Sequence, residues 1–419
     1  ELIFGGIPAS GTLPVGIGEL YEAGHGLKTQ AIRFHFVDHA TLGIPDSFMT
    51  MADSIALSGI ELGAYPGCQV LAARHGKIFY HKSFGYHTYD EVQAVGPTDL
   101  YDLASLTKIA ATTITVMEMT SEGTIDIDLP LSYYLPYLRA SDKHHVIIRE
   151  ILAHQARFRA WIPYFRHTLN EDEPDSMIYS TEISEDYPVR VAGGMYIHRD
   201  YYHEILDSIR YSSLRDDNSY NYSDLGFYLL KEAIEDIYNV TYEDLVEEKF
   251  YAPLGLPTMG YLPLKRFEPT RINPTEKDDN FRQQTLRGDV HDQGAAMLGG
   301  VSGHAGLFSN AFDVAVMMQL FLDGGIYGGD RYIEEAILDE FTSTQFPLNF
   351  NRRGIGFDKP LLEYEEDGPT CRSASHESFG HSGFTGTYAW ADPVNGLVYV
   401  FLSNRVHPDA SNPKIMEYD

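Results

Sequence analysis

Cysteine is scarce in this chain. Cys68 and Cys371 are the only two cysteines among 419 residues, and neither belongs to a CxxC pair or to a cluster of cysteine and histidine. A disulfide framework needs several cysteines, and a zinc site needs three or four ligands at characteristic spacings. The cysteines therefore predict neither a disulfide-stapled fold nor a zinc site.

The chain also has few positively charged residues and no long apolar run. The chain has 31 Lys and Arg residues against 60 Asp and Glu residues, a formal net charge of −29, and it contains no basic run. Such a surface repels phosphate groups, so nucleic acids and anionic membranes are not expected partners. No apolar run approaches the ~18 residues of a membrane span, so no membrane span is predicted.

Two common hydrolase signatures are missing as well. The zinc-protease motif HExxH does not occur, and residues 380–384 (GHSGF) miss the last glycine of the GxSxG motif. The chemistry of a zinc protease and the nucleophile turn of an α/β-hydrolase therefore lack their usual sequence support.

The first 41 residues differ in composition from the rest. They are rich in glycine and proline and show no sustained period of 2 or 3.6. We interpret residues 1–41 as a linker or as the tail of an upstream domain, and residues 42–419 as the folded domain. Because the chain begins with Glu1 rather than Met, we expect a processed product or an excised piece.

The later sequence alternates between strand and helix patterns. An amphipathic helix is predicted at residues 48–60, and two strands flank a turn at His75-Gly76. Further helices are predicted at 107–123, 149–155 and 225–240, and a second hairpin in a central sheet position at 387–404. This order predicts an α+β fold, in which helices flank an antiparallel sheet and a mostly helical subdomain at roughly 109–250 lies to one side.

The strongest chemical signal is Ser105-Leu106-Thr107-Lys108 at the start of an apolar helix. Residues three apart lie on one helix face, so Lys108 is expected beside the Ser105 hydroxyl. A lysine amine whose pKa is lowered can take the proton of a serine nucleophile or be part of its relay. Taken alone, the motif also fits a helix cap followed by a surface lysine.

A second element, Tyr222-Ser223-Asp224, immediately precedes another apolar helix. A lysine cation beside Tyr222 would lower the phenol pKa from ~10 and favour a phenolate base. The other interpretation is an ordinary helix start, with Ser223 or Asp224 as the cap.

The third element is His381-Ser382-Gly383, directly before a predicted strand. Small residues let the backbone approach a ligand, and a strand N–H at this edge can supply half of an oxyanion hole. A glycine-rich turn with a solvated histidine is the alternative.

These three elements in this order resemble the serine β-lactamase and penicillin-binding protein family, and most closely its class C β-lactamase and esterase branch. The resemblance covers residues 42–405 and includes the stretches YDLASLTKIAAT, ILAHQ, YNYSDLGFYLL, GGVSGHAGLFS and GHSGFTGTYAW. It implies the serine β-lactamase/DD-peptidase fold and a serine hydrolase that works through an acyl-enzyme, without a metal or cofactor.

The resemblance also implies roles for individual residues. Ser105 corresponds to the nucleophile, Lys108 to its base or relay, and Tyr222 to the group that passes a proton to the leaving group. The backbone N–H groups of Ser105 and Phe384 correspond to the oxyanion hole. His381 takes a catalytic position, and the substrate-binding positions fall on Asp224, Ser382 and Gly383.

Two positions depart from the family pattern. Asp224 stands where the family usually has Asn, and His381 stands where β-lactamases usually have Lys. An anionic Asp224 and a neutral histidine would bind the β-lactam carboxylate poorly, unless an arginine from a distant loop compensates. We therefore expect ester, D-amino-acid amide or peptide substrates rather than penicillins. A penicilloyl-binding or sensor module, acylated at Ser105 without turnover, is the alternative function.

The segment GGIPASGTLPVGIG at residues 5–18 looks like the end of a bacterial family-3 glycosidase. By this analogy the chain is fused to an upstream glycosidase, resides in the periplasm or elsewhere outside the cytoplasm, and acts on a small or peptidoglycan-derived substrate.

The sequence leaves the roles of two further groups of residues open. His291, Asp292 and His304 are either metal ligands or parts of a loop that shapes the cleft. The aromatic residues of the irregular stretch between the predicted helices either stack on a substrate or pack against each other. They include Trp161, Tyr164, Tyr196, Tyr201 and Tyr202.

Overall fold

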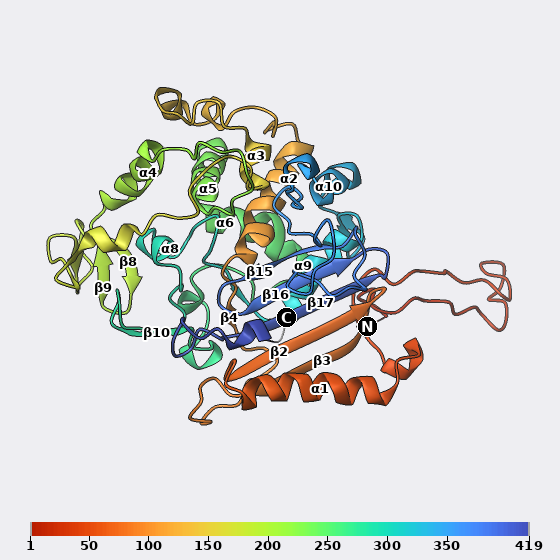
Figure 1. The fold of residues 1–419 in the computed structure, drawn as a ribbon. Helices are drawn as coiled ribbons and strands as arrows, with labels where there is room; N and C mark the ends of the chain where they lie inside the picture. The colour runs from red at the N-terminus through yellow and green to blue at the C-terminus, as the bar shows by residue number, and fades with distance from the viewer. Residues whose placement is uncertain (1, 418–419) are drawn as a thin grey trace.

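A six-stranded sheet forms the frame of the molecule, which was obtained as a computed structural model describing residues 2–417 (Figure 1). Its strand order is β1-β3-β2-β17-β16-β15, and every neighbouring pair is antiparallel except β1 and β3. The strands are β1 (His35–Phe36), β3 (Lys77–Gly85), β2 (Gly67–Arg74), β17 (Leu397–Ser403), β16 (Thr387–Asp392) and β15 (Phe379–Gly383).

Both predicted hairpins are confirmed. His75 and Gly76 have φ angles of 51° and 72° and join paired residues of β2 and β3, because a tight hairpin turn of this hand needs positive φ at both positions. The Asp392 carboxylate accepts hydrogen bonds from the backbone of the turn between β16 and β17. β17 lies between β2 and β16, which is the central position predicted for it.

Helices cover both faces of the sheet. Successive strand residues point to opposite faces, so Val70 packs in a cluster under α1 (Asp46–Glu61), while Leu71 belongs to the main core. α9 (Ala311–Leu322) contacts β2, β16 and β17 on the main-core side. α10 (Glu335–Thr342) packs against α2.

The region at 109–250 contains the predicted helices. It also contains a small sheet and a helix at residues 201–211, both within the stretch expected to be irregular. A π-helical segment, Lys108–Thr113, continues into α2 (Ile114–Ser121), and the later helices are α3 (Ile148–Leu152), α4 (Tyr201–Tyr211), α5 (Leu225–Tyr238), α6 (Tyr242–Val246) and α7 (Ala252–Leu254). The sheet has the order β7 (Tyr179–Ser180), β9 (Met195–Ile197), β8 (Val189–Ala192). Its strands have two to four residues, too few to produce a readable alternation in the sequence.

Short strand pairs and one further helix complete the fold. They are β4 (Tyr101–Asp102) with β12 (Phe308–Ser309), β5 (Leu169–Asn170) with β6 (Glu173–Pro174), β10 (Glu276–Asp278) with β11 (Gln284–Leu286), β13 (Ile326–Tyr327) with β14 (Asp330–Arg331), and α8 (Gln293–Met297). The pairing of β4 with β12 matters most for function, because it places the start of the Ser105 helix beside the loop at 302–307.

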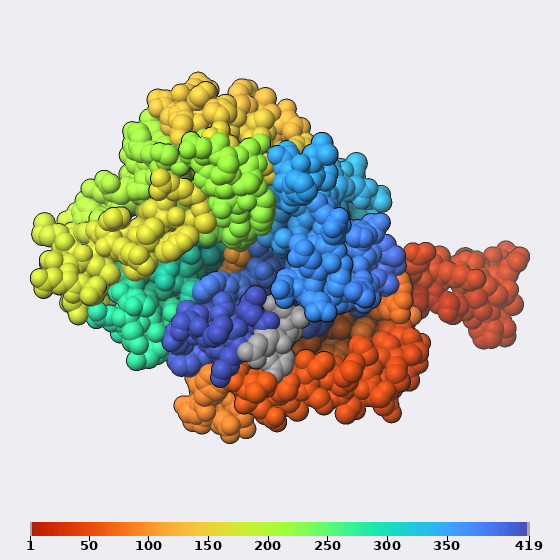
Figure 2. Space-filling view, viewed as in Figure 1, coloured from red at the N-terminus to blue at the C-terminus, as the bar shows by residue number. Residues whose placement is uncertain are grey.

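The N-terminal segment projects from the body of the molecule as an extended arm (Figures 1 and 2). It ends in β1, so the edge strand of the sheet comes from the stretch at 1–41. Among residues 2–417, none of the helices has the length and apolar character needed to cross a bilayer.

Candidate active site

Ser105 lies at the start of the helical segment that follows β4, directly after a constrained turn. Ala104 has a φ of 45°, which is unusual for a residue with a side chain. The buried Asp102 carboxylate holds this turn, since it accepts hydrogen bonds from the backbone N–H of Ala104 at 2.9 Å and of His291 at 2.7 Å. The position of the Ser105 side chain is therefore set by β4 and by the loop at 291.

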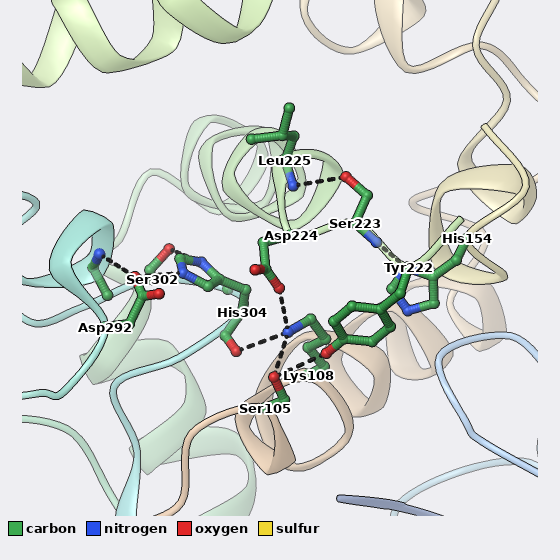
Figure 3. A network of polar contacts seen from close by, with 12 residues as sticks. Ser105, Lys108, His154, Tyr222, Ser223, Asp224, Leu225, Asp292, Ser302 and His304 are labelled. Carbon is green, nitrogen blue, oxygen red and sulfur yellow. Dashed lines mark hydrogen bonds and ion pairs between the residues drawn. The ribbon is translucent and has the colours of Figure 1, made fainter. Parts of the chain in front are cut away.

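The Ser105 hydroxyl is contacted by both of its predicted partners (Figure 3). The Lys108 ammonium donates a hydrogen bond to Ser105 Oγ at 2.9 Å, and the Tyr222 hydroxyl donates to the same oxygen at 2.8 Å. Lys108 arrives one helical turn after Ser105, whereas Tyr222 comes from the loop before α5. The tertiary structure thus brings together three side chains from two distant motifs.

Lys108 is fully buried and paired with Asp224. Its ammonium lies 2.7 Å from Asp224 Oδ1 and also donates to the His304 carbonyl oxygen at 3.2 Å. Burial alone would lower the pKa of Lys108, but the neighbouring Asp224 carboxylate and Tyr222 outweigh it, and the pKa of Lys108 is raised. The lowered lysine pKa expected from the sequence is therefore wrong for the resting site, where Lys108 is a cation.

Tyr222 is a neutral phenol. Its ring packs on the His154 ring with centroids 4.4 Å apart, and Arg353 lies over it at 5.2 Å. Burial raises the pKa of Tyr222, although Lys108 and Arg353 act in the opposite direction. The expected lowering of the phenol pKa is also wrong, because the sequence shows the neighbouring cation but not the loss of solvent.

His381 faces a buried arginine from the segment before β15. Arg353 Nη1 donates to His381 Nε2 at 3.0 Å, so the second ring nitrogen carries the proton and donates to the Ser382 carbonyl oxygen at 2.6 Å. Burial and the Arg353 charge lower the pKa of His381 to about 3, so the imidazole is neutral as expected. Asp358 pairs with Arg353 at 3.2 Å and holds it in place.

The sequence left open that an arginine from a distant loop compensates for the charges at Asp224 and His381, and Arg353 is such an arginine. The residues at 224 and 381 supply no fixed positive charge themselves, but Arg353 supplies one beside His381. Arg353 is only 5% exposed, so it acts on the site through the electric field of its charge and through its contact with His381. The catalytic role predicted for His381 and the binding role predicted for the exposed Ser382 stay predictions.

The backbone around Gly383 runs directly against the turn that precedes Ser105. A Cβ at Gly383 would lie 2.5 Å from the Leu103 carbonyl oxygen, so no side chain fits there. The Thr387 hydroxyl donates to that same oxygen at 3.0 Å and ties β16 to the turn. Within residues 2–417, no acceptor takes a hydrogen bond from the N–H of Ser105 or of Phe384. Both predicted oxyanion donors are thus unengaged.

We expect Gly383→Ala to reduce kcat by about 10²–10³-fold, the usual cost of losing one oxyanion-hole donor. The added Cβ must push the strand away from Leu103 and so displace the Phe384 N–H. Steady-state kinetics together with circular dichroism measure this effect. Gly11→Ala is the matched control, because nothing lies within 4 Å of its Cβ. Full activity of Gly383→Ala would contradict the oxyanion assignment.

The histidines of the loop at 291–304 contact different carboxylates. His304 Nε2 lies 2.8 Å from Asp292 Oδ1, and its other nitrogen lies 2.9 Å from the Ser302 hydroxyl. His291 instead faces Glu276 at 3.1 Å. No group of three or more potential metal ligands occurs in the part of the chain that the structure describes. The geometry favours the interpretation of a loop that shapes the cleft.

A pocket opens between the Tyr222 motif and this loop. Its lining includes Asp224, Asp292, Trp161 and Tyr164, so two of the five aromatic residues singled out in the sequence face it. The other three lie on β9 and α4.

Three side chains of the site carry no sequence signal of their own. Asp102 lies in the quoted stretch YDLASLTKIAAT but has no predicted role there, and Arg353 lies outside the quoted stretches. They reach the site through β4 and the chain before β15. His154 lies in the ILAHQ stretch, and its φ of 55° turns the chain so that its ring supports Tyr222. The ILAHQ stretch, which is part of the family resemblance, is the one sequence feature that indicated His154.

The chain is similar to proteins of a known family. The family model described as Beta-lactamase matches residues 58–417. A relative from Salmonella heidelberg (strain SL476), named "Putative D-alanyl-D-alanine carboxypeptidase", is 31% identical over 385 residues, which cover 84% of this chain and 81% of the relative.

Solved structures share the fold. A penicillin-binding protein homologue from Pyrococcus abyssi has a TM-score of 0.64 at 17% identity, with 88% of this chain and 76% of that chain covered. EstCE1, described as a hydrolase with promiscuous acyltransferase activity, also has a TM-score of 0.64, at 16% identity, with 89% and 98% covered. The predicted α+β fold of serine β-lactamases and DD-peptidases is confirmed. The chain therefore belongs to the beta-lactamase family, whose members are serine hydrolases.

Proposed function

We propose that this hydrolase cleaves an amide or peptide bond next to a D-amino acid in a peptidoglycan-derived substrate, with Ser105 as the nucleophile. The observation that carries the proposal is the shared contact of Lys108 and Tyr222 with Ser105 Oγ, at 2.9 and 2.8 Å. The name of the Salmonella relatives, which refers to D-alanyl-D-alanine carboxypeptidase, supports the substrate class.

Acylation begins with a proton transfer from Ser105. Because Lys108 is a cation in the resting site, it takes this proton only after passing one of its own to Asp224, 2.7 Å away. The Oγ–carbon bond forms as the carbonyl π bond opens. The N–H groups of Ser105 and Phe384 then stabilise the resulting oxyanion.

The tetrahedral intermediate collapses by releasing the leaving amine. Tyr222 is a neutral phenol, so it donates its proton to the leaving nitrogen as the carbon–nitrogen bond breaks, and Lys108 returns a proton to it. A water molecule then attacks the acyl-enzyme, and the same groups act in reverse order to free the acid and Ser105.

Arg353 bears on the choice of substrate. A carboxypeptidase substrate ends in a carboxylate, and Arg353 supplies positive potential beside His381 on the β15 edge. Asp224 acts against an anionic substrate from the other side of Ser105. Penicillins carry a carboxylate as well, so these charges do not separate the two substrates. We place peptides ending in D-Ala-D-Ala ahead of penicillins on the name of the Salmonella relatives.

We expect repeated turnover of a muropeptide ending in D-Ala-D-Ala, and a kcat/KM for a chromogenic cephalosporin below ~10⁴ M⁻¹s⁻¹, the lower end of ordinary enzymes. Rapid-mixing kinetics with both compounds measure this, and simple esters serve as reference substrates. One stoichiometric burst with every compound would instead identify the penicilloyl-binding or sensor module. Cephalosporin turnover above that value would contradict this order of substrates.

A peptidoglycan-derived substrate implies a location in the periplasm or elsewhere outside the cytoplasm. The fusion to an upstream family-3 glycosidase stays a prediction that rests on residues 5–18 alone.

A further inference from the structure

The pocket beside the nucleophile has an unusual combination of lining residues. Besides the two carboxylates, it is formed by apolar and aromatic side chains of three segments, and none of its lining residues within the described chain is Lys, Arg or His. The full lining is Trp161, Ile162, Tyr164, Phe165, Asp224, Leu225, Tyr228, Asp292, Gln293 and Gly294. The pocket is therefore acidic at its base and aromatic along its walls.

Each of the two carboxylates has a partner close by. Asp292 accepts hydrogen bonds from the Ala295 N–H at 2.7 Å and contacts His304 at 2.8 Å, and these groups hold the pKa of Asp292 well below its usual range. Asp224 is paired with Lys108 at 2.7 Å. In the resting site, the Lys108 cation thus faces Asp224, and Asp292 faces His304.

The walls carry a polar group without a partner. Tyr164 is only 7% exposed, yet its hydroxyl has no hydrogen-bond partner, and it lines the pocket within the electrostatic reach of Asp224 and Asp292. A buried hydroxyl without a partner is costly unless a ligand satisfies it. Trp161 is 52% exposed at the same pocket, so an indole face is available there as well.

We propose that this pocket binds a primary ammonium group on the acyl part of the substrate. Ionised carboxylates only accept hydrogen bonds, an ammonium group only donates them, and aromatic faces attract cations. The Lys108 nitrogen contacts both Asp224 Oδ1, at 2.7 Å, and Ser105 Oγ, at 2.9 Å. The pocket is therefore close enough to Ser105 for an acyl group bonded to this serine to reach it. The inference rests on the proposed function and narrows its substrate to acyl groups that carry a free amine.

The amine can belong to the α-position of the acyl residue or to the end of its side chain. Three boronic acids that add to the serine hydroxyl without turnover separate these sources. They are the neutral 1-acetamidobutyl boronic acid, the 1-aminobutyl compound with an α-amine, and the 1-acetamido-4-aminobutyl compound with a terminal amine. We expect one of the two amine-bearing compounds to bind about 10- to 100-fold tighter than the neutral compound, which is the usual gain from a charged hydrogen bond. The readout is the inhibition constant against hydrolysis of p-nitrophenyl acetate.

Asp292→Asn is the sharpest variant, because asparagine caps a helix start as well as aspartate does and removes only the charge. We expect it to bring the inhibition constants of the amine and neutral compounds to within about threefold. Tyr164→Phe should reduce the same ratio. Asp46→Asn is the matched control, since its carboxylate is 97% exposed on α1 and lies outside the pocket.

The outcomes separate this inference from the proposed function. Equal binding of all three compounds to an enzyme that a fluorophosphonate labels at Ser105 would overturn the ammonium pocket and leave the proposed function standing. An unchanged preference in Asp292→Asn would overturn it too. Failure of the probe and of every boronic acid to engage Ser105 would overturn the proposed function, and the inference with it.

Discussion

Ser105→Ala is expected to lose turnover by ~10³-fold or more and to lose all labelling by a fluorophosphonate probe. The reason is that, among residues 2–417, Ser105 Oγ is the one oxygen to which both Lys108 and Tyr222 donate, at 2.9 and 2.8 Å. Mass spectrometry of the labelled protein and steady-state kinetics on an ester measure the two effects.

Ser54→Ala is the matched control for this experiment. Ser54 is an exposed residue of α1, where its hydroxyl bonds only to the backbone of its own helix. It should keep both labelling and turnover. Labelling of any residue other than Ser105, or activity retained by Ser105→Ala, would overturn the assignment of the nucleophile.

Lys108→Ala and Tyr222→Phe are expected to be strongly non-additive. Both side chains act on the same serine oxygen, and the pair passes one proton between them, so removing either stops the same step. The double variant should cost at most about tenfold more than the worse single variant, while each single variant loses about 10² to 10⁴-fold, as expected for a group in proton transfer. The measurement is kcat/KM for one ester across all four proteins.

The control is a lysine and tyrosine pair outside the site. Lys249 lies 4.9 Å from the Tyr238 ring and pairs with Glu118 on the outer side of the helical region. Lys249→Ala with Tyr238→Phe should leave kcat/KM nearly unchanged. Thermal unfolding must accompany the Lys108 variant, because it leaves Asp224 without its cation. Fully multiplicative losses in a folded double variant would mean that Lys108 and Tyr222 serve separate steps.

The sequence alone determined those features that depend on local rules. The hairpin at His75-Gly76 follows from turn chemistry, and α5 follows from apolar periodicity with Asn239 in the left-handed conformation at its end. The Ser105 and Lys108 contact follows from a spacing of three on a helical segment. The small sheet of β7, β8 and β9 has no such local rule, because its strands are held by their mutual pairing.

Only the tertiary structure decided the electrostatics of the site. The sequence shows that Lys108 and Tyr222 belong together, but the direction of their pKa shifts depends on burial and on Asp224, and both shifts run opposite to expectation. Arg353 meets His381 because the strand β15 brings two distant stretches together. Desolvation and charge pairing act through space, so residue spacing along the chain carries no record of them.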